Sequence, residues 1–335
     1  MDKGKCLVIA EAGVNHNGRL DIALDLCDAA KLAGADVVKF QTWKTENLIT
    51  KSVGQAEYQK NNTGSEESQF DMLKKLELSY DDFRKIKKHC DDIGIIFAST
   101  ADEFESLDFL VNDIGIPFIK VGSGDICNIP FLEYIGSKHL PVIMSTGMSS
   151  LNDVDISINS LKKGGAENIT LLHCTTNYPC PYDDVNLKAM ITLKDTFGLP
   201  VGYSDHTRGR DVAIAAVTLG ATVIEKHFTL DCKMKGPDHL ASTEPKDFTD
   251  MIKGIRIIES CLGNGIKIPT QKEKFISEVV TKRIVAKRSI SIGETFNEQN
   301  ICIKRNNIGE KASLWEVVIG KKALREYDAD EGIEI

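Results

Sequence analysis

The sequence has few of the features that would place it in a membrane, outside the cell or on a nucleic acid. No apolar run approaches the roughly 20 residues that a transmembrane helix needs. The apolar stretch before Glu11 is too short for a secretory signal. The nine cysteines are an odd number and form no CxxC pair, which favours reduced thiols over disulfides or structural zinc. We therefore expect a cytoplasmic protein with no membrane partner.

Positive charge is also scarce. The 41 Lys and Arg residues are outnumbered by 49 Asp and Glu residues, which gives a net charge of -8. Because no dense basic stripe offsets this charge locally, a nucleic-acid partner is disfavoured. An anionic substrate would need a local cationic pocket.

What the sequence does have is a repeating pattern. Its 335 residues, 42% hydrophobic and 27% charged, suit one barrel-sized domain of roughly 250 residues with a small addition. Short β-branched apolar runs, each followed by a helical stretch, recur eight times before residue 262. The predicted strands are 6–10, 36–41, 95–99, 118–122, 142–145, 169–173, 201–204 and 222–227.

Eight βα units in series predict an α/β protein with a (β/α)8 TIM barrel over residues 1–262. A doubly wound open sheet is the alternative, but the chain has no glycine-rich nucleotide fingerprint. The long polar segment 42–68 is predicted as a loop over the barrel mouth. Residues 263–282 are predicted as a linker, and 283–335 as a small second domain of short strands and turns.

Polar residues follow almost every predicted strand. In a barrel of this kind the active site is built at the carboxyl ends of the strands. Singly, Lys39 could be an edge residue and His173 a hydrogen-bonded core histidine. Together they predict a catalytic mouth, formed by Glu11, Lys39, Gln41, Ser99, Lys120, Ser123, Ser145, His173, Ser204, Asp205, His206, Glu225 and His227.

Two groups in this set suggest chemistry. His206 and His227 end neighbouring strands about 5 Å apart, close enough to share one divalent metal with open positions for substrate. Lys39 and Lys120, with the hydroxyls of nearby serines, are the cations and donors that a bound phosphate needs.

These segments resemble the sialic acid synthase family, phosphoenolpyruvate-dependent enzymes that make nonulosonic acids. The resemblance covers nearly the whole chain, and its tail, with SISIGETF and IKR, looks like the family's antifreeze-like (SAF, β-clip type) domain. The motifs in the barrel are IAEAGVNHNG (9–18), GADVVKFQT (34–42), KVGSGD (120–125), MSTGM (144–148), LLHCTTNYPCP (171–181), GYSDHT (202–207), EKHFT (225–229) and GPDH (236–239).

The resemblance implies a role for each matching residue. His206 and His227 would hold the metal, Mn²⁺ preferred with Mg²⁺ or Co²⁺ possible, and Glu11 would be the catalytic carboxylate. Arg305 would reach the sugar's N-acyl group from the partner subunit of a domain-swapped homodimer. The substrate-binding residues would be Lys39, Lys120, Ser123, Ser145 and Ser204 for phosphoenolpyruvate, Gln41, Tyr178 and Asp238 for the amino sugar, and Ser99 and Asp125 beside them.

The expected reaction joins phosphoenolpyruvate to open-chain N-acetylmannosamine and water, giving N-acetylneuraminic acid and phosphate with C–O cleavage. A 2,4-diacetamido-trideoxyhexose leading to legionaminic or pseudaminic acid is the main alternative. Three departures lie on the sugar side: Asp125 where glutamate is common, Thr176 where some members have asparagine, and Asn306-Asn307-Ile308 where Pro and Gly usually follow the KR pair.

Three other functions fit parts of the pattern. A Schiff-base aldolase would use Lys39 or Lys120 as a nucleophile, which requires one desolvated lysine. A phosphoenolpyruvate-condensing enzyme that acts on a sugar phosphate would share much of the mouth but would not need the tail. A non-catalytic carbohydrate-binding protein would not need the histidine pair or Glu11.

Overall fold

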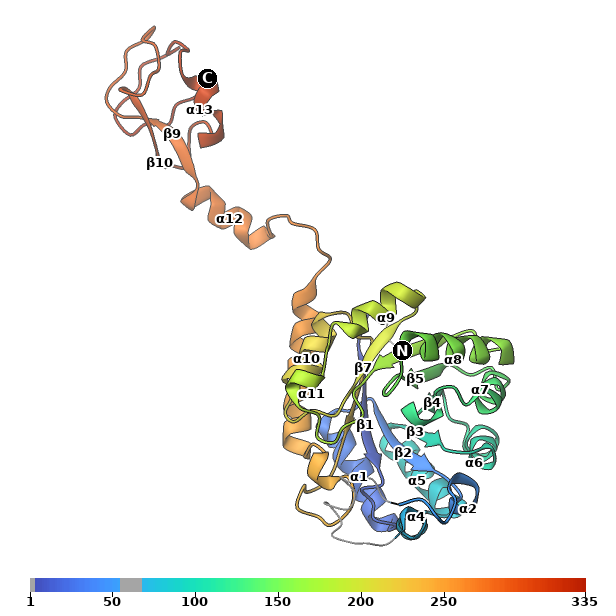
Figure 1. The fold of residues 1–335 in the computed structure, drawn as a ribbon. Helices are drawn as coiled ribbons and strands as arrows, with labels where there is room; N and C mark the ends of the chain where they lie inside the picture. Colours follow the sequence, from blue (N-terminus) through green and yellow to red (C-terminus); the bar gives the residue numbers. More distant parts are fainter. Residues whose placement is uncertain (1–3, 55–67) are drawn as a thin grey trace. The chain divides into compact units, whose positions relative to one another are not determined.

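The computed structural model describes residues 4–54 and 68–335, and the chain divides into two compact units, Met1–Gly263 and Asn264–Ile335 (Figure 1). In the described part of the chain no helix is both long and apolar enough to cross a membrane. The residues expected to form a linker, 263–282, include the helix α12 (Gln271–Val280).

Eight parallel strands close into a barrel in sequence order, which confirms the predicted (β/α)8 architecture. The open doubly wound sheet is excluded because β1 pairs with both β2 and β8. The strands β1 to β8 are Leu7–Gly13, Val37–Thr42, Ile96–Ala101, Ile119–Val121, Val142–Ser145, Ile169–His173, Val201–Asp205 and Val223–His227.

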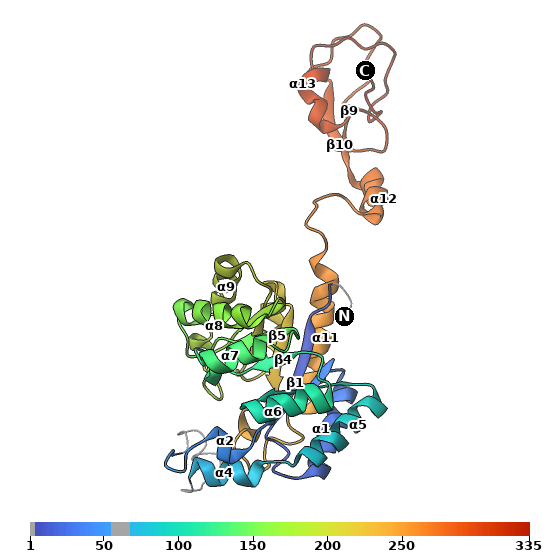
Figure 2. The same cartoon turned by 90° about the vertical axis from the view of Figure 1, so that its right-hand side faces the viewer.

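Helices lie outside these strands (Figure 2). In α1 the buried residues Ala23, Leu26, Cys27 and Ala30 recur at helical spacing, so one face packs on the barrel. Gly34 ends this helix with φ 90, a conformation that glycine adopts without strain. The main outer helices are α1 (Leu20–Ala33), α5 (Tyr80–Ile93), α6 (Phe104–Asp108), α7 (Ile129–Gly136), α8 (Leu151–Gly164), α9 (Ala189–Phe197), α10 (Asp211–Thr218) and α11 (Pro245–Leu262).

The segment predicted as a loop over the mouth is partly helical. Residues Thr45–Leu48 form α2, and α4 (Gln69–Leu76) follows directly after the segment. Thr45 is held by Glu77, whose carboxylate accepts both its backbone N–H and its hydroxyl. Residues 55–67 of the predicted loop lie outside the described residues.

Several strands extend further toward their carboxyl ends than the apolar runs predict. β1 continues to Gly13, so Glu11 lies within the strand, where it is paired in register with Lys39 and His227. Likewise β3 continues to Ala101 and β7 to Asp205. Polar residues can occupy these strand ends because the ladder is held by backbone groups, whatever side chains it carries.

The barrel interior is divided along its axis. An apolar cluster lines its amino-terminal half, whereas the polar residues of the predicted mouth line the carboxyl-terminal half. The cluster consists of Ile9, Val37, Ala98, Phe118, Ile143, Leu172 and Val223.

The second unit has a small core of its own. Strands β9 (Lys282–Ala286) and β10 (Ile301–Arg305) pair antiparallel, and α13 (Trp315–Val318) follows. Residues 289–293, within the segment predicted to hold short strands and turns, form no strand, although Ile290 makes a single bridge with Tyr327. The core contains Ile284, Ala286, Ile290, Phe296, Ile301, Val318, Ala323, Tyr327 and Ile333.

Candidate active site

A pocket of about 210 Å³ lies at the carboxyl ends of the barrel strands and collects most of the predicted site residues. Strand alternation explains this, because every second side chain of a barrel strand points inward. The predicted residues that line the pocket are Glu11, Lys39, Gln41, Lys120, Ser123, Ser145, Tyr178, Ser204, His206, Glu225 and His227.

Glu225 lies between the two lysines of the pocket. Its Oε1 is 3.4 Å from Lys120 Nζ and its Oε2 is 3.7 Å from Lys39 Nζ. Ser204 donates its hydroxyl to the same carboxylate at 3.1 Å. Burial opposes ionisation of Glu225, but the charges of Lys120 and Lys39 outweigh burial and lower its pKa to about 2. The sequence pattern predicts Glu225 at the rim without a role, and the structure shows it as the shared counter-charge of both lysines.

Lys39 is the centre of a second set of contacts. Its Nζ lies 2.7 Å from Glu11 Oε2 and donates to Thr100 Oγ1 at 3.0 Å, while Gln41 donates to Glu11 Oε1 at 2.9 Å. Burial lowers the pKa of Lys39, but the charges of Glu11 and Glu225 outweigh it, so the pKa is raised. Lys39 is thus held as a cation, which suits an anion-binding role better than a Schiff base.

Glu11 is buried beside this cation. Burial raises the pKa of Glu11, and repulsion from Glu225 raises it further. The attraction of Lys39 lowers it but does not outweigh the other two effects. A carboxyl with a raised pKa in a pocket is suited to proton transfer near neutral pH.

Hydroxyl donors surround the second lysine. Lys120 Nζ donates to Ser145 Oγ at 2.7 Å. Ser123 accepts the backbone N–H of Gly147 at 3.0 Å and lies 3.3 Å from Cys174 Sγ.

Burial lowers the pKa of Lys120 more than the charge of Glu225 raises it, so Lys120 is the lysine closer to what a Schiff base requires. The two lysines and the adjacent hydroxyls are the cations and donors that an anionic substrate needs, with Glu11 and Glu225 offsetting their charge.

His206 and His227 face the pocket as a pair, with ring centroids 5.4 Å apart and Tyr178 beside both rings at 4.2 and 5.4 Å. The His206 ring is oriented by Nδ1, which donates to Thr175 O at 2.7 Å and leaves the Nε2 lone pair free of a proton. Nδ1 of His227 is buried, with no hydrogen-bond partner among the described residues.

Burial lowers the pKa of both imidazoles, so both are neutral and can donate a lone pair to a cation. In the described part of the chain there is no cluster of three or more His, Cys, Asp or Glu that would form a closed metal site. An ion at this pair would have two imidazole ligands from the protein and its other positions open.

Six predicted residues lie outside this pocket. Two of them were predicted at the mouth: His173, whose Nε2 donates to Val185 O at 2.7 Å, and Asp205, which pairs with Lys226 at 2.7 Å. The other four are Asp238, Asp125, Arg305 and Ser99.

Asp238 is behind His227, with Oδ2 3.8 Å from His227 Nδ1, and burial raises its pKa to about 7. Asp125 lies in the short helix Ser123–Asp125 after β4, where its carboxylate accepts a hydrogen bond from the side-chain amide of Asn128. Burial raises the pKa of Asp125. Arg305 is exposed on β10 of the second unit.

Ser99 is the fourth. Its hydroxyl bonds to Thr42 at 2.7 Å, and its neighbour Thr100 lines the pocket instead. Because β3 continues past Ser99, strand alternation turns Thr100 inward. The sequence reasoning thus missed Thr100, which the alternation could have identified.

Asp102 was also missed. It follows β3, lines the pocket, and donates its backbone N–H to Thr42 O at 3.2 Å. Burial raises its pKa to about 8, with the charge of Asp125 adding to the effect. A lone aspartate beyond a predicted strand carries no signal of this placement in the sequence.

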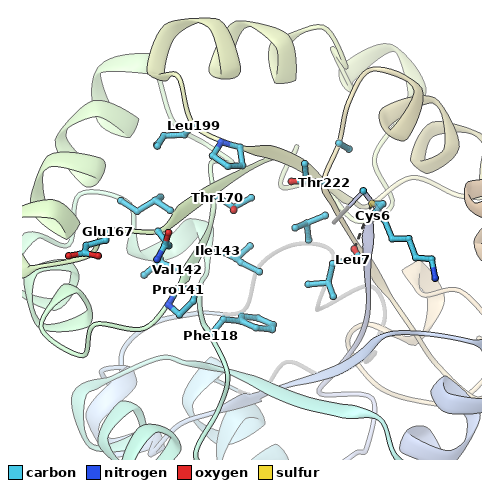
Figure 3. A pocket seen from close by; sticks show the side chains of 17 residues that line it. Cys6, Leu7, Phe118, Pro141, Val142, Ile143, Glu167, Thr170, Leu199 and Thr222 are labelled. Atoms are coloured by element: carbon cyan, nitrogen blue, oxygen red, sulfur yellow. Dashed lines mark hydrogen bonds between the residues drawn. The ribbon is translucent and has the colours of Figure 1, made fainter. Parts of the chain in front are cut away.

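A larger hollow of about 560 Å³ lies at the opposite end of the barrel (Figure 3). Its walls are mainly apolar, with Leu7, Phe118, Ile143 and Leu199 among them. Its described lining residues bring together no cluster of charges and imidazoles like that of the mouth. The smaller pocket is therefore the better candidate for chemistry.

A closed (β/α)8 barrel whose carboxyl-end mouth buries two lysines, two acids and a histidine pair has the form of a barrel enzyme. The model of the NeuB family matches residues 26–267. The chain therefore belongs to the NeuB family, which confirms the resemblance to sialic acid synthases.

Relatives and solved structures agree with this assignment. The chain is 47% identical over 329 residues to the N,N'-diacetyllegionaminic acid synthase of Campylobacter jejuni, covering 98% of each chain. It is 45% identical over 321 residues to the enzyme of the same name from Legionella pneumophila, covering 95% of this chain and 90% of that one. The N-acetylneuraminic acid synthetase structure from Leptospira borgpetersenii has a TM-score of 0.71 and 33% identity, covering 82% of this chain and 90% of that one.

Proposed function

We propose that this protein is a nonulosonic acid synthase that joins phosphoenolpyruvate to an N-acylated amino sugar and releases phosphate. The observation that carries the proposal is the pair of buried lysines, Lys39 and Lys120, bridged by Glu225 next to the neutral histidine pair. Membership of the NeuB family supports it.

The relatives change the sugar that we favour. The family resemblance by itself favours N-acetylmannosamine, yet the relatives with 47% and 45% identity are both N,N'-diacetyllegionaminic acid synthases. The N-acetylneuraminic acid synthetase structure shares 33% identity. We therefore propose a 2,4-diacetamido-2,4,6-trideoxyhexose as the amino sugar and a legionaminic acid as the product.

Phosphoenolpyruvate would bind through charge. Lys39 and Lys120 would pair with its phosphate and carboxylate, and Ser145 and Ser204 would add hydroxyl donors. Ser145 accepts from Lys120, so its own O–H is positioned to donate before substrate arrives. The O–H of Ser204, in contrast, donates to Glu225 and would have to rotate toward the substrate. The preorganisation of Ser145 is favourable because little reordering is needed on binding.

His206 and His227 would hold the divalent ion, with Mn²⁺ preferred. When bound, such an ion supplies Lewis-acid polarisation of the sugar's aldehyde oxygen. The protein's own contribution is to keep both imidazoles neutral by burial and to fix the His206 ring through Thr175.

The bond formed joins carbon 3 of phosphoenolpyruvate to the aldehyde carbon, and water adds at carbon 2 before phosphate leaves. Glu11, whose pKa is raised by burial, would give a proton to the aldehyde oxygen or take one from the water. Gln41 and Tyr178 line the same pocket and would bind the sugar, with Asp238 and Asp125 beyond them.

Arg305 would contact the N-acyl group from the partner subunit of a domain-swapped homodimer, with the second unit as an antifreeze-like domain. This proposal comes from the family resemblance and the exposure of Arg305 on β10. Mixing an Arg305→Ala chain with a His206→Ala chain should restore part of the activity, because some mixed dimers keep one intact mouth. If the subunits exchange and no activity returns, Arg305 does not act on the mouth of the partner subunit.

The decisive experiment measures phosphate release from phosphoenolpyruvate with Mn²⁺ and each amino sugar in parallel. We expect the diacetamido sugar to exceed N-acetylmannosamine in kcat/KM by more than about tenfold, or roughly 1.4 kcal/mol of transition-state preference. The opposite preference would restore the N-acetylneuraminate assignment. No phosphate release with any amino sugar would overturn the synthase and favour a binding protein.

A further inference from the structure

Two charged side chains lie behind the histidine pair, on the faces of β7 and β8 that point away from the pocket. Lys226 stands between Glu225 and His227, which both line the pocket, and Asp205 follows Ser204, which also lines it. Strand alternation therefore turns Lys226 and Asp205 outward, toward the helix layer. The two are paired in register, and their side chains are only 2% and 0% exposed.

These residues and Thr207 form a closed set of contacts. Lys226 Nζ donates to Asp205 Oδ2 and to the backbone oxygen of Thr207, both at 2.7 Å. Asp205 Oδ1 accepts the backbone N–H of Thr207 at 2.9 Å and its hydroxyl at 2.7 Å. The cluster thus fixes the chain on both sides of His206.

The same contacts reach the second histidine. Lys226 directly precedes His227, so its bonds to Asp205 and Thr207 tie the carboxyl end of β8 to the turn that follows β7. His206 is held further by its ring bond to Thr175 and by its backbone oxygen, which accepts from Cys180 at 2.8 Å. The spacing of the two imidazoles therefore depends on a short chain of buried bonds.

Stability alone does not account for a charged pair at this position. The layer between barrel strands and outer helices is largely apolar, and a buried ion pair is often no more stabilising than apolar residues of similar volume. A cluster that satisfies its polar groups does, however, define one local geometry. That property matters where two ligands must keep a fixed separation.

We propose that Asp205, Lys226 and Thr207 form a positioning cluster that holds the imidazoles of His206 and His227 at the separation that one divalent ion needs. The inference rests on the metal centre of the proposed function. The three residues act through the histidines and do not touch substrate. Groups of this kind behind metal ligands commonly change metal affinity by about 10- to 100-fold.

The test is Mn²⁺ binding to the full-length protein, followed by the loss of the free-ion electron paramagnetic resonance signal. The variants are Lys226→Met and the double variant Asp205→Asn/Lys226→Met. The asparagine of the double variant keeps an oxygen for the Thr207 bonds and leaves no unpaired buried charge. Arg256→Met is the control, because it breaks another ion pair, Arg256 to Asp36 at 2.8 Å, away from the pocket.

We expect both Lys226 variants to bind Mn²⁺ about 10- to 100-fold more weakly, and Arg256→Met to bind it like the unaltered protein. The double variant should melt closer to the unaltered protein than Lys226→Met does. At saturating Co²⁺, the visible spectrum of the double variant should also shift, because the ligand geometry changes.

The outcomes separate this inference from the proposed function. Unchanged Mn²⁺ affinity and Co²⁺ spectrum in the double variant would make the cluster purely structural and overturn the positioning role alone. A loss of affinity in Arg256→Met equal to that of the Lys226 variants would also overturn it, because the effect would then follow general destabilisation. If the unaltered protein binds no Mn²⁺, the metal centre itself is wrong and this role falls with it.

Discussion

The two ends of the barrel are made from the same eight strands but hold opposite kinds of side chain. The carboxyl end buries Glu11, Lys39, Lys120 and Glu225 around a pocket of about 210 Å³. The amino end surrounds a hollow of about 560 Å³ with mainly apolar side chains, among them Phe118 (Figure 3). The convergence of charges and imidazoles, and not the size of the hollow, distinguishes the end suited to chemistry.

The energetics of the two ends differ in the same way. Buried charges are costly unless they are paired, so the cluster of Lys39, Lys120 and Glu225 contributes little net stability. Apolar packing around Phe118 contributes directly to the free energy of unfolding. Substitutions at the histidine pair and at Phe118 should therefore separate activity from stability, whereas removal of one lysine also leaves a buried carboxylate unpaired.

The largest effect is expected at the histidine pair. His206→Ala or His227→Ala should abolish phosphate release from phosphoenolpyruvate and amino sugar, because each removes one of two proposed metal ligands. The melting temperature should change little, because both imidazoles are neutral and line the pocket rather than the apolar core. A chelator should have the same effect on the unaltered protein, and added Mn²⁺ should reverse it. Full activity in excess chelator would contradict the metal centre.

A smaller but still large loss is expected at the lysines. Lys39→Met and Lys120→Met should each lower kcat/KM for phosphoenolpyruvate about 10- to 100-fold, because a hydrogen bond to a charged group is worth about 1.5–3 kcal/mol. Steady-state phosphate release measures this loss. Trapping of pyruvate on either lysine by borohydride would instead support the aldolase.

At the amino end the effect should fall on stability. Phe118→Ala should lower the free energy of unfolding by about 3–5 kcal/mol, as for other large buried side chains, because Phe118 is 1% exposed in the barrel interior. Denaturant titration measures the loss, and the kcat/KM of the folded variant should match the unaltered protein. If Phe118→Ala lost activity but kept its stability, the two ends of the barrel would not differ in the way proposed.

The last effect is a pH dependence of stability that arises at His16, in the turn after β1. Burial lowers the pKa of His16 to about 4, and its Nδ1 accepts the backbone N–H of Gly18 at 3.0 Å. The unfolded chain, with a histidine pKa near 6.5, binds more protons below that pH. The contribution of His16 to stability should therefore be full above about pH 6.5 and fall by up to about 3 kcal/mol as the pH drops toward 4, in addition to that of His239, whose pKa burial also lowers to about 4.

Denaturant titrations at several pH values test this expectation, with His16→Gln as the variant that should flatten the dependence. Phe118→Ala is the matched control, because its loss of stability should be the same at pH 7 and pH 5. An identical pH dependence in His16→Gln would show that another group is responsible.

The barrel could be predicted because each strand and helix has a local pattern in the sequence. Eight apolar runs with helical stretches between them predicted all eight strands, and the family motifs identified most of the pocket residues. The ends of the strands could not be predicted as well, because a polar residue such as Glu11 can extend a parallel ladder once its neighbours are in place.

Other parts of the site depended on neighbours that are distant in the sequence. Ser99 was predicted at the mouth, but the continuation of β3 turns Thr100 inward instead. Asp102 gave no sequence signal, and the link between Asp205, Lys226 and Thr207 joins residues on two strands.

The sequence by itself determined the alternation of strands and helices, the closure into a barrel and the family, because these follow from periodic apolar residues and contiguous motifs. Only the tertiary structure decided that Glu225 is shared by Lys39 and Lys120 and that burial keeps both histidines neutral. The reason is physical: a side chain's charge state and partners depend on the distance to groups on other strands and on exclusion of water, and neither exists before the barrel closes.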